Sequence, residues 1–244
     1  MIDFKKKILD FEPDQNDEIN ECNIFKCKFT NLTPESIKYI KYDLLTTLNI
    51  SIYSLSDNNS LKLLCNFLEI NKTIKHISLE SNNLRDEGAI YLSDLLTKNN
   101  TIKTLVIGGN NITNIGLNAF TESLKVNKNL KQFIAVNNNF TAKSIIYFLN
   151  TLKLNKSIHK LMLGCFYKEN NNSNFENHLL DCVFNNDTIC YIDLINSVTE
   201  DNIKKDIVSK LNYNNNIKYT YDKRFIFSIN EFILKILIPL KNYE

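Results

Sequence analysis

The fold of this chain is decided by residues 74–99, which read IKHISLESNNLRDEGAIYLSDLLTKN. The first part alternates apolar and polar residues around Ile77 and Leu79, which predicts a short β-strand. The second part places Leu92 and Leu96 four residues apart, which predicts a helix with one apolar face. A strand and a helix of this size cannot bury their apolar faces alone, so the stretch must pack against further copies of itself.

The same pattern recurs at an interval of 28 residues. A second unit follows with Ile102, Leu105, Ile107, Asn110, Ile112, Gly116, Phe120, Leu124 and Asn127. A third follows with Leu130, Phe133, Ala135, Asn138, Phe140, Ser144, Phe148, Leu152 and Asn155. Weaker units begin near Ile24, Leu45, Ile158 and, after a longer interval of 31 residues, Ile189. We therefore predict about five good repeats with imperfect ends.

Stacked strand–helix units predict an α/β solenoid with a parallel sheet on its concave face and helices on its convex face. We expect a short right-handed arc, because the chain is too short for a closed horseshoe. Residues 1–23 are assigned to an N-terminal capping segment, 24–216 to the repeats and 217–244 to a C-terminal cap. The cap contains a predicted amphipathic helix with apolar residues Ile229, Phe232, Ile233, Ile236 and Leu240. A helix on a membrane surface is the alternative, but its polar face lacks the necessary lysines and arginines.

An asparagine follows each of the three best strands, at Asn82, Asn110 and Asn138. A buried turn leaves backbone groups without partners, and an amide side chain can both donate and accept to satisfy them. We predict a column of such asparagines along the solenoid. The column is interrupted at Tyr53, Phe166 and Ser197, where the repeats should be less regular.

These units resemble the leucine-rich-repeat family over about residues 24–215, and most specifically over residues 74–157. The period of 28 residues and the full helix near Gly88 and Gly116 are similar to the ribonuclease-inhibitor-like subfamily. That subfamily also occurs in innate-immunity receptors and in bacterial effectors delivered into host cells. The resemblance implies a horseshoe segment and a protein-binding role. It implies no catalytic residues, because the family motif carries structure only.

Composition excludes several classes of protein. The chain has 244 residues, of which 43% are hydrophobic, with 29 basic and 27 acidic residues and a net charge of +2. This charge is too mild to indicate a nucleic-acid partner, and no apolar stretch is long enough for a membrane-spanning helix or a signal peptide. Six cysteines without metal-binding spacing indicate reduced thiols in the cytoplasm, or in the host cytosol for a translocated effector.

We predict no enzyme activity, no metal and no cofactor. The three histidines, His76, His159 and His178, lack the spacing of a zinc site, and the first two are expected to face solvent. The pair Gly108-Gly109 is too short for a phosphate loop and is interpreted as a small-residue site or a turn. A cysteine-dependent enzyme, or a ubiquitin-pathway recruiting factor, is the alternative, although no base is placed beside any thiol.

The residues between the inward-pointing strand positions should line the concave face and form a partner-binding site. Its predicted apolar centre comprises Val106, Ile134, Val136, Met162 and Ile195. Its predicted polar rim comprises His76, Glu80, Gln132, Lys160, Tyr191 and Asp193. An apolar centre with a polar rim is typical of a protein interface. Two alternatives stay open, namely that a terminal segment of the chain covers the sheet or that these residues are selectively neutral.

The longer repeat adds a second candidate contact. Its extra residues lie near Phe166 and Tyr167, which would be exposed on a loop beside the sheet. The alternative is an asparagine-rich loop without a binding role. We expect the protein to bind another protein through the concave sheet, without nucleic acid, membrane insertion or a small-molecule cofactor, and an effector from an intracellular bacterium would fit this composition.

Overall fold

The computed structural model describes residues 24–27, 46–50, 58–164, 173–194 and 201–219. Within them, seven strands form one sheet in the order of the sequence, and every adjacent pair is parallel. The strands are β1 (Ile24–Cys27), β2 (Thr47–Ile50), β3 (His76–Ser78), β4 (Thr104–Val106), β5 (Gln132–Ile134), β6 (Lys160–Met162) and β7 (Tyr191–Ile192). The helices are α3 (Asn58–Ile70), α4 (Arg85–Lys98), α5 (Asn114–Val126), α6 (Ala142–Leu152), α7 (Ser173–Phe184) and α8 (Asp201–Tyr219).

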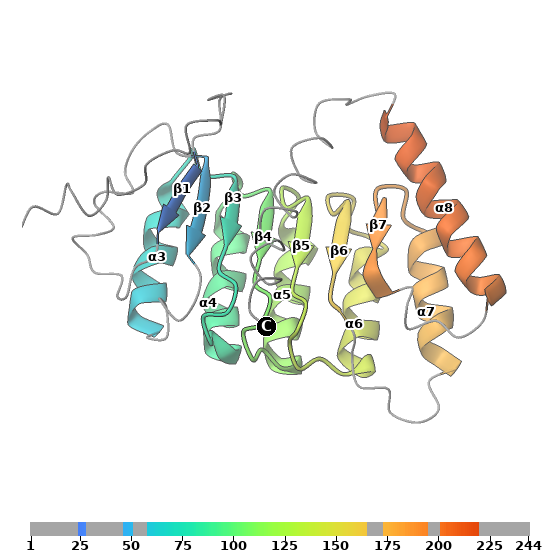
Figure 1. Cartoon of the computed structure of the whole chain (residues 1–244), viewed down its shortest axis with the longest axis horizontal. Coiled ribbons are helices and arrows are strands. Elements are labelled where there is room, and N and C mark those ends of the chain that lie inside the picture. Colours follow the sequence, from blue (N-terminus) through green and yellow to red (C-terminus); the bar gives the residue numbers. More distant parts are fainter. Residues whose placement is uncertain (1–23, 28–45, 51–57, 165–172, 195–200, 220–244) are drawn as a thin grey trace, which may run out of the picture.

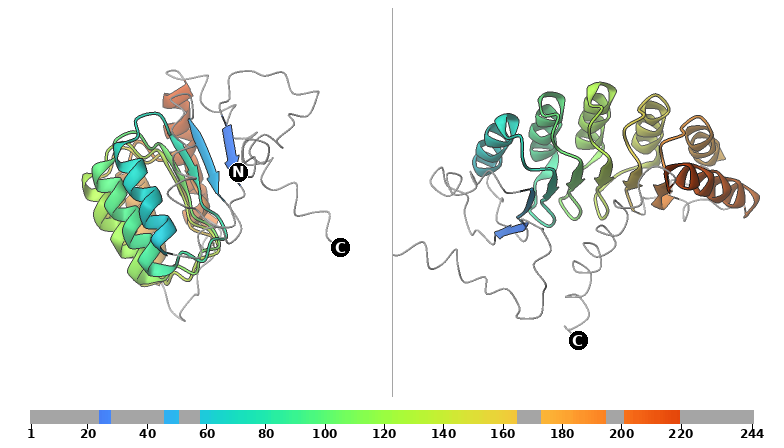
Figure 2. Two further views of the ribbon diagram at one scale, coloured as in Figure 1. Left: turned by 90° about the vertical axis from the view of Figure 1, so that its left-hand side faces the viewer. Right: turned by 90° about the horizontal axis from the view of Figure 1, so that it is seen from above.

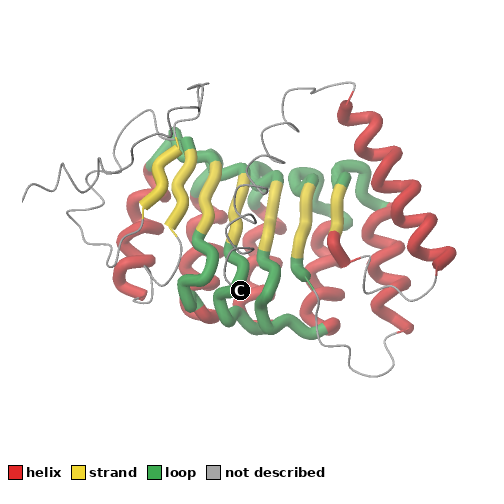
Figure 3. Tube along the Cα trace, in the orientation of Figure 1, coloured by secondary structure: helices red, strands yellow, loops and turns green. Residues whose placement is uncertain are grey.

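The elements form two layers, as the repeat pattern predicts. Seen from above, α3 to α7 form an outer row and the strands an inner row, and both rows curve gently toward the strand side (Figure 2). From β2 to α8, strands and helices alternate along the arc (Figures 1 and 3). The predicted solenoid with a concave parallel sheet is therefore confirmed.

The register of the sheet follows the repeat period. Each residue of β3 pairs with the residue 28 positions later in β4, and β4 pairs with β5 in the same way. As a result Leu79, Ile107 and Ala135 lie at equivalent positions between the sheet and the helices, and each has an exposed fraction of 0%. The stacked interior is the core.

Aromatic residues fill the middle of this core. The rings of Phe120 and Phe133 lie 5.0 Å apart between centroids, and those of Phe133 and Phe148 lie 5.6 Å apart. Centroid distances in this range are favourable for aromatic pairs. Phe133 therefore connects the second and third repeats through α5 and α6.

The predicted asparagine column is present. The Asn110 side chain accepts from the backbone nitrogens of Asn82 and Leu84 in the preceding repeat, at 2.8 and 3.3 Å. It donates to the carbonyl oxygens of Leu79 and Gly108, at 2.8 and 3.1 Å. Asn138 makes equivalent contacts as acceptor and donor, and Asn82 makes the equivalent donor contacts to the carbonyl oxygens of Ile50 and Glu80. The interruptions predicted at Tyr53, Phe166 and Ser197 lie outside the described residues.

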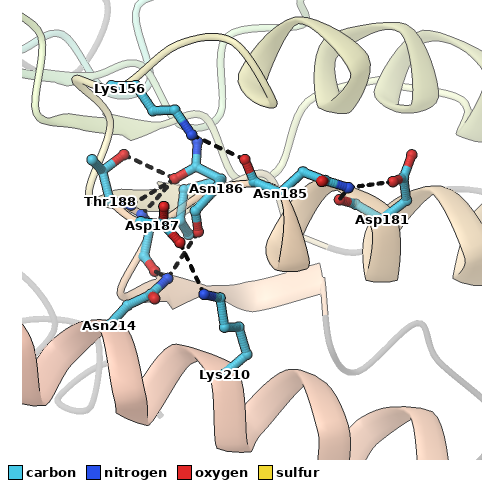
Figure 4. Close-up of polar contacts among 9 residues, drawn as sticks. Lys156, Asp181, Asn185, Asn186, Asp187, Thr188, Lys210 and Asn214 are labelled. Carbon is cyan, nitrogen blue, oxygen red and sulfur yellow. Dashed lines mark hydrogen bonds and ion pairs between the residues drawn. The ribbon is translucent and has the colours of Figure 1, made fainter.

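A second ladder of asparagines follows the helices. In it Asn99, Asn127, Asn155 and Asn186 each donate to carbonyl oxygens of the preceding repeat and accept from the backbone nitrogens that follow. Asn214 ends the ladder, donating to the carbonyl oxygens of Asn186 and Ile189 at 2.9 and 2.8 Å (Figure 4). These bonds align the loops that join each helix to the next strand.

The C-terminal end of the stack is covered by α8. Ile207 and Leu211 of this helix have exposed fractions of 0% and 5% and pack into the core. The helix continues to Tyr219, past the repeat boundary predicted at residue 216. Residues 1–23 and 220–244, which include most of the predicted caps, lie outside the described residues. No helix in the described ranges is long and apolar enough to cross a bilayer.

Candidate functional site

Two columns of side chains, each with one residue per strand, run across the concave face. One column runs from Thr47 through His76, Thr104, Gln132 and Lys160 to Tyr191. The next runs through Asn49, Ser78, Val106, Ile134 and Met162. Parallel pairing places consecutive members of a column on adjacent strands, about 4.8 Å apart. The geometry of the predicted site is therefore present, whereas its binding role stays a prediction.

The apolar centre is more deeply buried than its place on an outer sheet face suggests. Val106 has an exposed fraction of 4% and Ile134 one of 7%, whereas Met162 and Val136 are half-buried. The accessible apolar surface is consequently concentrated near β6.

Several rim residues are also buried against their neighbours, contrary to expectation. His76 was expected to face solvent, but it is half-buried and its Nδ1 lies 2.9 Å from the Thr104 hydroxyl. Burial, together with the nearby Lys75, lowers the pKa of His76 below its usual value. Gln132 has an exposed fraction of only 4%, and His159 is half-buried.

Lys160 and Tyr191 form the most accessible part of the rim. The Lys160 ammonium lies 4.9 Å from the centre of the Tyr191 ring, a distance that allows a cation–π interaction. Tyr191 remains 46% exposed. Burial lowers the pKa of Lys160, while the nearby Asp193 carboxylate opposes this shift.

Asp193 takes part in the sheet. Its carboxylate accepts from the backbone nitrogens of Leu163 and Gly164, at 2.9 and 2.6 Å. In earlier repeats the backbone nitrogen at the position of Leu163 donates to a backbone carbonyl of the next strand, as Ala135 does to Met162. Burial raises the pKa of Asp193, and the two backbone donors oppose that rise. Part of the hydrogen-bonding capacity of this predicted contact residue is thus used within the fold.

Glu80 lies beside the glycine pair. A Cβ added to Gly108 would lie 3.2 Å from the Glu80 carboxylate and from Val136, so only glycine leaves this space free. Gly109 follows with a φ of +65°, which a turn at this point requires. The pair is thus a small-residue site and a turn, as interpreted from the sequence. Burial raises the pKa of Glu80.

Two polar groups of the concave face were not selected from the sequence. The Ser78 hydroxyl oxygen and the Asn49 side-chain oxygen are buried and have no hydrogen-bond partner in the described part of the chain. They lie on adjacent strands. The sequence signal that could have identified them is polar residues in the column where later repeats have Val106 and Ile134.

Three predicted contacts, Ile195, Phe166 and Tyr167, lie outside the described residues.

Three cysteines in the described residues are free thiols, of which Cys190 is half-buried. Cys65 and Cys182 are buried, and burial raises the pKa of each thiol to about 12, so both are protonated at neutral pH. Within the described ranges, no group of three His, Cys, Asp or Glu side chains could hold a metal ion.

Comparisons with known proteins agree with this architecture. A family described as "Leucine Rich repeat" matches residues 71–93 and 98–120. The fold is similar to the tropomodulin C-terminal domain of Caenorhabditis elegans, with a TM-score of 0.60, 12% identity and coverage of 67% of this chain and 96% of that chain. A structure titled leiomodin-1 actin-binding site 2 matches with a TM-score of 0.49, 15% identity and coverage of 55% and 76%. No curated protein sequence matches the chain significantly.

Proposed function

Since this chain is a leucine-rich-repeat protein, we propose that it binds a partner protein through the concave face of its sheet. Stacked repeats create extended concave surfaces that suit protein recognition. The observation that carries the proposal is the placement of apolar side chains on three adjacent strands, with Val106 on β4, Ile134 on β5 and Met162 on β6.

Val106 on β4 and Ile134 on β5 are buried, so the proposed contact lies toward the C-terminal half of the concave face. Met162 and Val136 are only half-buried, and Tyr191 is 46% exposed. Tyrosine is enriched among residues that dominate binding energy, because it offers a large apolar surface with one polar group. The proposed centre of the interface is therefore Met162 with Tyr191 beside it and Lys160 at the rim.

A protein partner fits this face better than a nucleic acid does. Lys160 is the single lysine or arginine at the described concave positions of β2 to β7. Nucleic-acid affinity depends on several contacts between basic residues and phosphates. One half-buried lysine does not supply them.

The test is a quantitative affinity purification from cells that express the protein, using the full chain and two variants. Met162→Asp places a charge in the proposed interface. Ile115→Asp makes the same type of change at a convex position of α5 that is 64% exposed. A partner should be retained by the wild type and by Ile115→Asp, and lost with Met162→Asp while the circular dichroism spectrum is unchanged.

Retention of every partner by the Met162→Asp variant would contradict the concave-face proposal. If a partner is lost, calorimetry with that purified partner measures the change in affinity. We expect Met162→Asp to weaken binding more than about tenfold, because it introduces a charge into a desolvated contact. The ribonuclease-inhibitor-like subfamily, the cytoplasmic location, the effector role and the recruiting alternative remain predictions from the sequence.

A further inference from the structure

One edge of the solenoid combines exposed aliphatic side chains with lysines that form no ion pair, three of which, Lys103, Lys128 and Lys156, donate to neutral oxygens. This lysine edge consists of the loops that join helix ends to strand starts, at residues 70–75, 98–103, 126–131 and 154–159. The second asparagine ladder bonds successive loops to one another. The loops therefore lie in a line along one edge of the molecule (Figure 3).

The basic residues of the edge recur at fixed repeat positions. Lys72, Lys128 and Lys156 directly follow Asn71, Asn127 and Asn155, and Lys75, Lys103 and Lys131 lie four residues after Asn71, Asn99 and Asn127. Within the described ranges none of these six lysines forms an ion pair. The pKa of Lys131 is lowered, first by burial and then by the neighbouring Lys103.

The carboxylates at this edge are already neutralised by other lysines. Lys98 pairs with Glu69 and Asp94, and Lys125 pairs with Glu122. Lys153 pairs with Asp181, and Lys210 pairs with Asp187 (Figure 4). The six edge lysines therefore give this side of the molecule an uncompensated positive charge.

Exposed apolar side chains lie directly before Asn71, Asn127, Asn155 and Asn214, whereas Lys98 and Asn185 lie before Asn99 and Asn186. Ile70 is 74% exposed, Val126 61%, Leu154 83% and Tyr213 59%. Lysines near helix C-termini stabilise the helix dipole, but that effect does not account for aliphatic side chains held in water between them. A ligand that contacts both the lysines and the aliphatic side chains would account for the two together.

We propose that the lysine edge docks on the surface of an anionic phospholipid bilayer. The lysines would contact the headgroups, while Ile70, Val126 and Leu154 would enter the interfacial region without crossing it. Peripheral binding of this kind increases with both buried apolar area and attraction to anionic lipids. The surface differs from the concave face, so this inference does not depend on the proposed partner binding.

Two other anionic partners fit the edge less well. Protein interfaces are depleted of lysine and enriched in arginine, yet every cation of this edge is a lysine. Proteins that bind single-stranded nucleic acids stack bases on aromatic side chains, whereas Ile70, Val126 and Leu154 are aliphatic. The interleaving of lysine with aliphatic residues favours a lipid surface.

The first experiment measures sedimentation of the full chain with phosphatidylcholine vesicles, with and without phosphatidylserine. We expect binding only with phosphatidylserine, and its loss in roughly 1 M salt, where the Debye length is about 3 Å. The triple variant Lys75→Glu/Lys103→Glu/Lys131→Glu should bind at least about a hundredfold more weakly, because each lysine near such a surface contributes about fivefold.

The matched control is Lys62→Glu/Lys143→Glu/Lys205→Glu, which changes the net charge equally at exposed helix positions away from the edge. It should retain most of the binding, and circular dichroism should show both variants folded. Absence of binding to phosphatidylserine vesicles, or equal losses in the two triple variants, would overturn the proposal.

A second variant separates a bilayer from a soluble polyanion. Val126→Ser/Leu154→Ser should weaken vesicle binding about tenfold, because less apolar area is buried, and should leave binding to soluble polyglutamate unchanged. Vesicle binding that is insensitive to this variant would contradict the lipid proposal and indicate an acidic protein partner. Met162→Asp should bind vesicles like the wild type, so failure of the concave-face proposal would be seen separately.

Discussion

At the scale of single residues, side-chain amides replace the backbone partners that the turns of this fold lack. Asn82, Asn110 and Asn138 are partly or fully buried where the chain leaves a strand, and they bond to backbone groups of adjacent repeats. Asparagine suits this place because one side chain supplies both acceptor and donor. The sequence predicted this column because its spacing and its chemistry agree.

Replacing Asn110 by alanine should destabilise the fold strongly. The residue is fully buried and makes four hydrogen bonds to backbone atoms, two as acceptor and two as donor. Each buried group left without a partner costs about 1–3 kcal/mol, so we expect a loss of about 3–5 kcal/mol in the free energy of unfolding. Urea denaturation measures it. Asn100→Ala, at an exposed position, should change stability by less than about 0.5 kcal/mol.

His76 should make stability depend on pH near neutrality. Burial lowers its pKa in the folded state below the usual 6.5, so the folded protein holds the imidazole neutral where the unfolded chain binds a proton. Its stabilising effect is therefore present above about pH 6.5 and is lost as the pH falls below that value. As the pH is lowered from 8 to 5, the urea midpoint of the wild type should fall more steeply than that of His76→Gln.

Glu80 has the opposite effect of pH on stability, so the wild type must be compared with His76→Gln, which keeps Glu80. Burial raises the pKa of Glu80, so its ionised form destabilises the fold and acidification relieves that cost. Subtracting the pH profile of His76→Gln from that of the wild type removes the Glu80 contribution, which both proteins share. Identical slopes in wild type and variant would show that folding does not lower the pKa of His76 and would contradict this prediction.

At the scale of elements, the helix starts differ from expectation for a reason that the structure supplies. The family resemblance implies helices that begin near Gly88 and Gly116, and the structure has α4 beginning at Arg85 and α5 at Asn114, three and two residues earlier. Glycine at these places allows close packing within the first turn. A Cβ added to Gly116 would lie 2.4 Å from the Ile112 side chain and 2.7 Å from that of Ala89.

Gly116→Ala should therefore destabilise the fold despite the better helix propensity of alanine. The propensity gain is about 1 kcal/mol, whereas overpacking costs about 1–3 kcal/mol. A contact of 2.4 Å cannot be relieved by a small shift, so we expect a net loss of about 1–2 kcal/mol. Thermal unfolding gives the sign. Asn118→Ala, on the outer face of the same helix, should be neutral or slightly stabilising, and a stabilised Gly116→Ala would contradict this account.

The candidate site could be predicted in position but not in accessibility. The alternation within strands and the period of 28 residues place Val106, Ile134 and Met162 in one column, and the sheet register has them there. Burial depends on curvature and on neighbouring rotamers, which a repeat pattern does not contain. The use of Asp193 within the sheet depends likewise on how β6 meets β7.

At the scale of the whole molecule, stability is built from contacts between neighbours. The main helix contacts join consecutive helices, from α3 with α4 to α7 with α8, and the strands pair only in sequence order. A stack of this kind behaves nearly as a one-dimensional chain of repeats and interfaces. A local loss at one end should therefore affect few repeats, whereas the same loss at the centre divides the stack.

Two buried aliphatic residues allow this difference to be measured. Ile207 in α8 and Leu124 in α5 have exposed fractions of 0% and 1%, and truncation of either to alanine should cost about 2–5 kcal/mol. Hydrogen exchange should accelerate mainly in α7 and α8 for Ile207→Ala, because α8 has one helical neighbour. For Leu124→Ala it should accelerate in α4, α5 and α6. Equal acceleration of α4 in both variants would mean that the solenoid unfolds as a single cooperative unit.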